Sequence, residues 1–166
     1  VHQSLAEPFC SALTTHLDAV ATKAREADTL DTDVVDGGTY VCIEGPQFST
    51  KAESEFYRSQ GWDVIGMTAI PEAKLAREAE LAYAAVTGVT DYDVWREESV
   101  TLEEVLDNAA ANEAAFETLL TQAIRELPVD HTCDCHSALA GSINTPAEAV
   151  PEATRQRLNL LVGEYI

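Results

Sequence analysis

Residues 40–50 read Tyr-Val-Cys-Ile-Glu-Gly-Pro-Gln-Phe-Ser-Thr, an apolar run that stops at a Gly-Pro pair and continues into a polar segment. Two more apolar runs follow, and the three together predict strands at 40–43, 62–67 and 82–89. Segments with helical periodicity separate these runs, an alternation that is typical of buried strands in an α/β sheet. The sequence therefore predicts an α/β fold with a mixed central sheet flanked by helices.

Signals for helix ends define the segments between and around the strands. They predict helices at 8–27, 50–60, 71–80, 101–126 and 151–161. Ser49 or Thr50 is expected to cap the second helix, and Thr101 opens a capping box at the fourth. Pro71 is expected at the first position of the third helix, where a missing N–H does no harm.

Composition limits the classes of partner. The chain has 166 residues, enough for one domain, and no apolar run long enough to span a membrane. Asp plus Glu total 29 against 10 Lys plus Arg, a net charge of −19, which excludes nucleic acid and anionic membrane as partners. So many scattered acids favour a cytoplasmic protein of a halophile, and a haloarchaeal source; an ordinarily acidic mesophilic enzyme is the alternative. No targeting segment is evident.

Ligands of open α/β sheets bind beyond the carboxyl ends of the strands. Applied to this chain, that rule places Phe48, Met67, Asp91 and Asp93 around one crevice. We therefore expect the functional site there.

Three motifs in this region are more specific than the pattern of elements. They are Ile-Glu-Gly-Pro-Gln-Phe-Ser-Thr (43–50), Gly-Met-Thr (66–68) before Pro71-Glu72, and Thr-Asp-Tyr-Asp-Val-Trp (90–95). In these the chain resembles the trimeric purine nucleoside phosphorylases, most closely the branch that acts on 5′-deoxy-5′-methylthioadenosine. The likeness covers most of residues 1–126.

The resemblance implies a reaction and an assembly. Phosphate, as co-substrate and without a cofactor, would attack C1′ of methylthioadenosine and release adenine and 5-methylthioribose 1-phosphate. The assembly would be a homotrimer, or a hexamer of paired trimers, with sites at subunit interfaces. Residues 1–127 would be the C-terminal portion of the phosphorylase domain, and 128–166 a tail with Cys and His residues and a short helix.

The two acids of the third motif match the family's base-recognition positions. Asp91 matches the catalytic residue that hydrogen-bonds the purine N7 edge, and Asp93 matches the residue that meets the 6-amino group. Relatives specific for 6-oxo purines carry Asn where Asp91 stands and Glu where Ser49 stands, so these three residues imply adenine. Two solvated acids in a turn are the alternative interpretation.

Three more residues match positions around the nucleoside and phosphate. Phe48 matches the residue that stacks on the base, Met67 the residue under the ribose, and Thr68 a phosphate contact. Without the resemblance, Phe48 and Met67 would be interpreted as core side chains and Thr68 as a cap.

The remaining matches concern the 5′ end of the nucleoside. Leu102, Val105 and Leu106 match the apolar wall that accepts the 5′-methylthio group, although their spacing is that of any amphipathic helix. His2 matches a residue that reaches across the trimer interface, and alone it would be an ordinary surface residue.

The cysteines allow several interpretations. Cys10, expected on the apolar face of the first helix, and Cys42, expected in a strand, are most simply small buried hydrophobes. The segment His131-Thr-Cys133-Asp-Cys135-His136 has a poor spacing for tetrahedral zinc. We rank structural or redox-labile thiols first, adventitious metal second and a zinc site third, and predict no metal.

The resemblance also shows which part of the family's site is missing. The family's glycine-rich phosphate loop and its Arg-His pair would lie upstream of Val1, so we expect a fragment of a longer protein. Alone it should bind purines weakly and turn over little. Two other functions stay open as alternatives to a methylthioadenosine phosphorylase. One is a phosphorylase of 6-oxo purine nucleosides, and the other is a truncated, non-catalytic module that binds purines or forms trimers.

Overall fold

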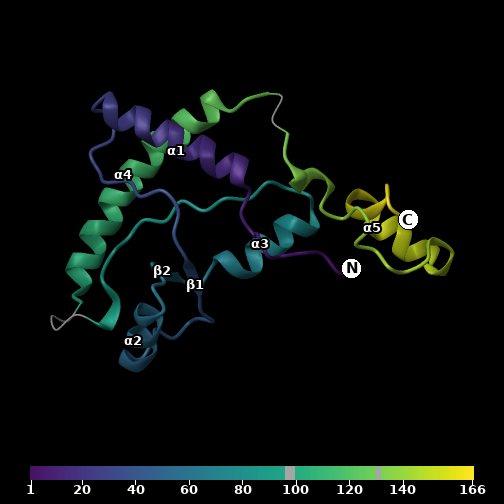
Figure 1. The fold of residues 1–166 in the computed structure, drawn as a ribbon, viewed down its shortest axis with the longest axis horizontal. Coiled ribbons are helices and arrows are strands. Elements are labelled where there is room, and N and C mark those ends of the chain that lie inside the picture. The colour runs from purple at the N-terminus through teal and green to yellow at the C-terminus, as the bar shows by residue number, and fades with distance from the viewer. Residues whose placement is uncertain (96–99, 130–131) are drawn as a thin grey trace. The chain divides into compact units, whose positions relative to one another are not determined.

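The computed structural model describes residues 1–95, 100–129 and 132–166. The acidic loop predicted at 96–99 and the candidate ligand His131 lie outside the described residues. The elements follow one another along the chain as α1 (Ser11–Glu26), β1 (Tyr40–Cys42), α2 (Lys51–Ser59), β2 (Val64–Gly66), α3 (Ala69–Glu78), η1 (Asp93–Trp95), α4 (Leu102–Glu126), η2 (Asp134–Ser137), η3 (Ala147–Ala149) and α5 (Glu152–Val162) (Figure 1).

The chain forms two compact units. The first combines the N-terminal residues Val1–Thr14 with Ile70–Ala85 and the described part of the tail, and the second consists of Thr15–Ala69 and Val86–Val129. The first unit contains α3, η2, η3 and α5, and the second contains the two strands with α2, η1 and α4. The predicted boundary between residues 127 and 128 stays a prediction.

The sheet lies in the second unit. β1 pairs with β2 in parallel, with Tyr40 opposite Val64 and Cys42 opposite Gly66. α2 connects the two strands, so the α/β class is confirmed, and the first two predicted strands exist with shorter bounds. Among the described residues the sheet has only these two parallel strands, and it is smaller than the mixed sheet that we expected.

The strand predicted at 82–89 is wrong, because the described residues offer this segment no neighbouring strand. Its carbonyl groups accept hydrogen bonds from other sources. Tyr83 O accepts from the Cys10 N–H at 2.7 Å, and Val89 O accepts from the Asn112 side-chain amide at 3.0 Å. An apolar run shows that a segment is buried, but it does not provide the pairing partner that makes it a strand.

The helix ends agree with the local sequence signals. The Thr50 side chain accepts from the Glu53 N–H, and the Glu53 carboxylate accepts from the Thr50 N–H at 2.7 Å, which completes a capping box at α2. Thr101 caps α4 by accepting from the Glu104 N–H at 3.2 Å. At α3 the dihedral angles of Ile70 are extended, as expected before a proline, so regular helix begins at Pro71.

The first helix begins later than predicted. Cys10 precedes α1, and it does not lie on the apolar face of that helix. Its N–H is bonded outside the helix to Tyr83 O, while its carbonyl accepts the first helical bond from the Thr14 N–H at 2.9 Å. Cys10 therefore takes the N-cap place, and its side chain is buried with 3% exposure.

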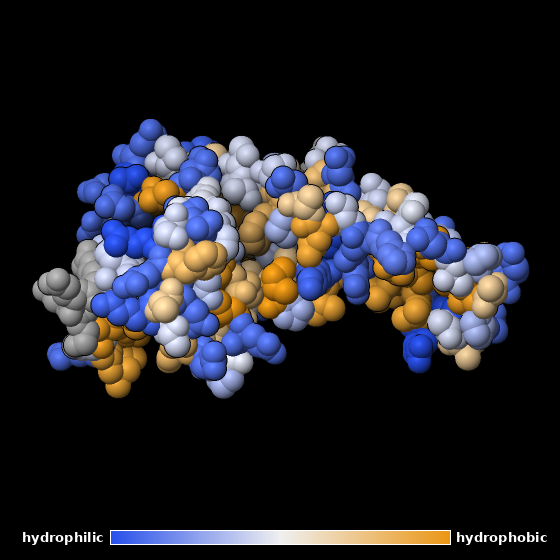
Figure 2. Space-filling model, turned by 60° about the horizontal axis from the view of Figure 1, so that its bottom comes forward, coloured by the Kyte–Doolittle hydropathy of each residue, from blue (hydrophilic) through white to orange (hydrophobic). Residues whose placement is uncertain are grey.

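Many large apolar side chains remain exposed, and Figure 2 shows them as orange atoms among hydrophilic ones. In the second unit Phe48 is 83% exposed and Leu102 is 73% exposed. In the first unit Leu160 is 94% exposed. None of the described helices is both long and apolar enough to cross a membrane.

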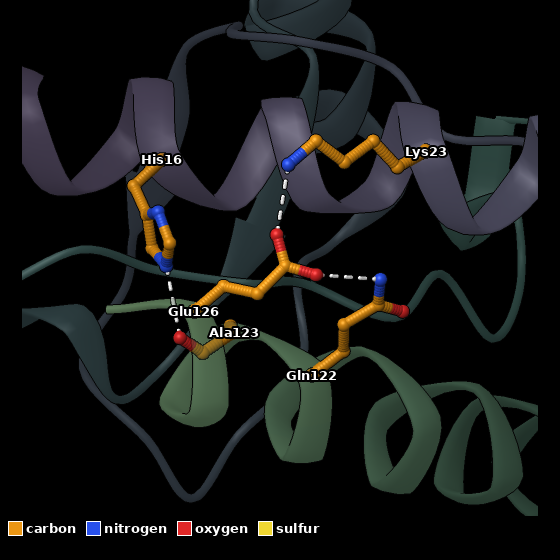
Figure 3. A network of polar contacts seen from close by, with 5 residues as sticks. All are labelled: His16, Lys23, Gln122, Ala123 and Glu126. Atoms are coloured by element: carbon orange, nitrogen blue, oxygen red, sulfur yellow. Dashed lines mark hydrogen bonds and ion pairs between the residues drawn. The ribbon is translucent and has the colours of Figure 1, made fainter. Parts of the chain in front are cut away.

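The core of the second unit forms where α1 packs on α4 and on the segment after α1. It consists of Val20, Ala21 and Ala24 of α1, Leu30, and Leu119 and Ala123 of α4. Polar contacts cover its edge (Figure 3): the His16 ring contacts Ala123 O at 2.9 Å, and Lys23 Nζ lies 2.8 Å from Glu126 Oε2. The hydrogen bonds from Lys23 and Gln122 lower the pKa of Glu126. Because the ion pair is largely exposed, most of the stability at this contact comes from the apolar residues.

Candidate functional site

The two acids of the third motif form a single turn. Asp91 Oδ1 accepts from the Asp93 N–H at 2.8 Å, and Asp91 Oδ2 accepts from the Thr90 hydroxyl at 2.8 Å. Both carboxyl oxygens therefore have a donor, and the orientation of the carboxyl group is fixed. Asp91 and Asp93 are both partly buried.

The backbone of this turn is unusual at Asp93. Its φ is +56°, in the left-handed region that non-glycine residues rarely adopt, although Asp is among those that tolerate it. Residues held in such conformations cluster at functional sites. η1 begins at this residue and ends at Trp95.

The long helix α4 holds the segment that leads into the turn. Asn108 Nδ2 donates to Thr90 O at 2.7 Å, and Asn112 Nδ2 donates to Val89 O at 3.0 Å. Gly88 makes the close approach possible, since a Cβ there would lie 2.7 Å from Asn112 Cγ and 2.8 Å from Phe116 Cζ. Two side-chain amides of α4 thus hold the backbone of the two residues that precede Asp91.

The support from Asn108 and Asn112 was not predicted from the sequence. Two asparagines one helical turn apart in an alanine-rich helix were the available signal, because asparagine is a poor helix former and needs another reason to be there. Gly88 gave a weaker signal as a lone glycine in an apolar run.

The strand ends bring Met67 against the Gly-Pro turn. A Cβ on Gly45 would lie 2.7 Å from Met67 Sδ, so the thioether occupies the place that a side chain at 45 would take. Gly66 is similarly constrained, because a side chain there would collide with the Tyr40 ring. Met67 is partly buried, and the next residue, Thr68, is exposed.

The residues that precede α2 differ in exposure. Phe48 is 83% exposed, whereas the Ser49 hydroxyl oxygen is buried and has no hydrogen-bond partner in the part of the chain that the structure describes. The other end of α2 reaches η1, where the Arg58 guanidinium carbon lies 4.0 Å from the centre of the Trp95 ring. This cation–π contact connects α2 to the element that begins at Asp93.

The predicted apolar wall is at the start of α4. Leu102 and Leu106 are 73% and 58% exposed, and Val105 is partly buried. His2 belongs to the first unit, where its backbone N–H donates to Ser142 O at 2.8 Å. The structure thus joins Asp91 to Asp93, and Met67 to the Gly-Pro turn, while Phe48 and the two leucines face solvent.

Comparison with known families gives a match over most of the chain. A model described as the Phosphorylase superfamily matches residues 1–125. The S-methyl-5′-thioadenosine phosphorylase of Nitrosopumilus maritimus is 48% identical over 139 residues, which are 84% of this chain and 51% of that protein. The one from Geobacter sulfurreducens is 42% identical over 167 residues, covering 99% of this chain and 56% of the relative.

Solved structures agree with these sequence matches. A methylthioadenosine phosphorylase from an antarctic soil metagenomic library has a TM-score of 0.78 and 39% identity, covering 96% of this chain and 56% of that one. A methylthioadenosine phosphorylase from Schistosoma mansoni in complex with adenine has a TM-score of 0.73 and 32% identity, with 86% of this chain and 55% of that chain covered. The chain spans about half the length of the relatives that it matches.

Proposed function

Because the chain belongs to the phosphorylase superfamily, we propose that it forms the purine- and ribose-binding part of a 5′-methylthioadenosine phosphorylase. The reaction is attack of phosphate on C1′, with release of adenine and 5-methylthioribose 1-phosphate. It needs a proton or donor at the departing base and contacts to the sugar and the phosphate. The observation that carries the proposal is the oriented pair of Asp91 and Asp93.

In this proposal Asp91 is the general acid or proton-sharing group at purine N7. Its two oxygens already accept hydrogen bonds from Thr90 and from the Asp93 N–H, so the carboxyl group does not have to be reoriented when substrate binds. Asp93 accepts from the 6-amino group of adenine. Such fixed orientation is the structural requirement for efficient proton transfer.

The other contacts are assigned by their matches to family positions and by their exposure. Phe48 stacks on the base. Ser49, whose buried hydroxyl oxygen has no hydrogen-bond partner among the described residues, contributes to the selection of adenine. Met67 lies under the ribose and Thr68 contacts phosphate. No metal or cofactor takes part.

The assembly proposed is a homotrimer, or a hexamer of paired trimers, in the cytoplasm of a halophile. Leu102, Val105 and Leu106 accept the 5′-methylthio group, and His2 contributes from a neighbouring subunit. The exposure of Leu102 and Leu106 supports this assignment, because burial of apolar side chains under substrate or another subunit is favourable.

Two candidates compete with this function. A phosphorylase of 6-oxo purines would favour an amide where the two carboxylates stand. A non-catalytic purine-binding or trimer-forming module is favoured by one observation, namely that the chain spans about half of its relatives' length.

The deciding experiment measures phosphate-dependent release of adenine from methylthioadenosine in high salt. The chain is assayed alone and joined behind the N-terminal portion of the Nitrosopumilus maritimus relative. We expect activity only from the joined form, and Asp91→Ala should lower its kcat by on the order of 10². Glu113→Ala, an exposed acid on α4, is the matched control.

The outcomes separate the candidates. An unchanged kcat for Asp91→Ala would remove the catalytic role of this residue. Inosine turned over faster than methylthioadenosine would favour the 6-oxo purine enzyme. If the joined form binds adenine but releases none from the nucleoside, the module interpretation replaces the enzyme.

A further inference from the structure

Three cysteines that are far apart in the sequence meet in the first unit. The sulfur atoms of Cys10, Cys133 and Cys135 lie within 4.8 Å of one another, and all three are free thiols. Cys10 and Cys135 are 3% and 7% exposed, and Cys133 is partly buried. The sequence showed only the Cys-x-Cys pair, and Cys10 supplies the third sulfur that the pair lacked.

The backbone at each cysteine is held in place. The Cys10 N–H is bonded to Tyr83 O at 2.7 Å. Cys133 is the N-cap of η2, and Cys135 O accepts from the Ala138 N–H at 3.3 Å. The thiols therefore converge from two anchored segments, which lowers the entropy that would be lost when a ligand draws them together.

A positive charge lies beside the sulfurs. Arg77 of α3 donates from Nη1 to Cys135 Sγ at 3.9 Å. Burial raises the pKa of the Cys135 thiol to about 12, so a cation that binds there displaces a proton. The neighbouring guanidinium group favours the thiolate that results. Three thiolates and a monovalent cation carry a net charge of about −2, which one arginine partly offsets.

We propose that Cys10, Cys133 and Cys135 form a three-sulfur site for one thiophilic cation, with a preference for Cu(I) over Zn(II). Thiolate ligands select soft ions such as Cu(I) and zinc, and three sulfurs can complete the coordination of Cu(I). A structural zinc ion requires four ligands, whereas the group formed by the described residues has only these three. The bound ion would connect the N-terminal segment to the tail, and it is independent of the phosphorylase reaction.

The test is a titration of the reduced chain with Cu(I) under anaerobic conditions, in competition with a chromophoric Cu(I) chelator. We expect one equivalent bound, and a loss of affinity of more than about 100-fold in each of Cys10→Ser, Cys133→Ser and Cys135→Ser. Cys42→Ser is the matched control, because Cys42 lies in β1 of the other unit. A parallel arm with Zn(II) and a zinc chelator tests the preference.

X-ray absorption on the unsubstituted chain adds a readout that does not require a variant to fold. Three sulfur neighbours of the bound copper at a single distance would support the site. Two sulfur neighbours would mean that only the Cys-x-Cys pair binds the ion, and would overturn the three-sulfur site. The proposal is also overturned if Cys10→Ser binds as tightly as the parent, or if Zn(II) is bound and Cu(I) is not. A disulfide between two of these cysteines that resists reduction would overturn it as well.

Discussion

In the proposed function, Asp93 contributes to the selection of adenine through the chemistry of its side chain. A carboxylate accepts from the 6-amino group of adenine, whereas an amide can donate to a 6-oxo group. In the active joined enzyme we expect Asp93→Asn to shift the ratio of kcat/KM for adenosine over inosine toward inosine, by about 10- to 100-fold, the size of one charged hydrogen bond. Steady-state kinetics with both nucleosides give this ratio.

The control for this prediction uses the backbone of the same residue. Asp93 has a φ of +56°, which both Asn and Gly tolerate, so Asp93→Gly removes the carboxylate without straining the turn. It should lower activity on adenosine without raising activity on inosine. If Asp93→Asn leaves the preference for adenosine where it was, Asp93 does not recognise the 6-position.

A substitution at Gly88 tests whether the segment before the Asp91–Asp93 turn must lie close to α4. In Gly88→Ala the new Cβ would meet Asn112 Cγ at 2.7 Å, so the segment or the helix has to move. We expect a loss of about 1 to 3 kcal/mol in the free energy of unfolding, the usual cost of overpacking. Urea denaturation measures it, with Thr87→Ala as the exposed neighbour for comparison. Equal stability in the two variants would contradict the close contact.

At the scale of elements, the capping box of α2 can be tested alone. Thr50→Ala removes the acceptor for the Glu53 N–H, and it should lower the free energy of unfolding by about 1 kcal/mol, whereas Thr50→Ser should retain most of it. Thr50→Ala should also raise the pKa of Glu53, because it removes the hydroxyl that, after the retained Thr50 N–H, lowers that pKa. NMR titration of the carboxyl group checks the second effect. Equal loss in the Ser variant would mean that the cap contributes through packing.

The contact of the tail with the end of α3 predicts a dependence on pH. Glu80 Oε1 accepts from the Tyr165 hydroxyl at 2.6 Å and from the Leu139 N–H at 2.9 Å. The Tyr165 hydroxyl is the larger cause of a lowered pKa at Glu80, and the carboxylate in turn raises the pKa of Tyr165 to about 12.

The sign follows from the two shifts. The stabilisation from Glu80 is complete above its ordinary pKa of 4.5 and is lost as the pH falls through its lower folded value. The stabilisation from Tyr165 is complete below its ordinary pKa of 10.0 and is lost as the pH rises through its folded pKa of about 12. Tyr165→Phe should therefore lower the melting temperature most between these limits, and thermal melts across the pH range measure the difference. A difference that does not change with pH would contradict the pair, and Tyr57→Phe in the other unit is the control.

The elements also show what a sequence can and cannot predict. Caps at Thr50 and Thr101 were predictable, because a cap needs only side chains within one turn of the helix end. The strand at 82–89 failed because pairing depends on a distant partner. The α/β class could be predicted, but the extent of the sheet could not.

The candidate site divides in the same way. The turn formed by Asp91 and Asp93 involves neighbouring residues, so a local motif could indicate it, whereas their role in a reaction stays a prediction. The supports from Asn108 and Asn112, and the approach of Cys10 to the Cys-x-Cys pair, join residues far apart in the chain. No local pattern encodes such contacts, and the folded chain was needed to find them.

For the whole molecule, the charge is the dominant property. A net charge of −19 on 166 residues makes the folded state repel itself, because folding brings the acids closer together than they are in the unfolded chain. Salt weakens this repulsion, and by 1 M the screening length has fallen to about 3 Å. Ordinary screening of the charges should therefore be nearly complete at 1 M salt. In a protein adapted to a saline cytoplasm, stability should continue to increase above 1 M.

The melting temperature in potassium chloride separates these two effects. If the protein is halophilic, we expect the melting temperature to rise below 1 M and to keep rising at several molar. Replacement of the exposed acids Asp107, Glu113 and Glu117 on α4 by their amides should flatten the lower part of this curve, since fewer charges remain to be screened. A curve that levels off near 1 M fits an ordinarily acidic mesophilic enzyme, and a melting temperature indifferent to salt would mean that repulsion among the acids does not limit stability at all.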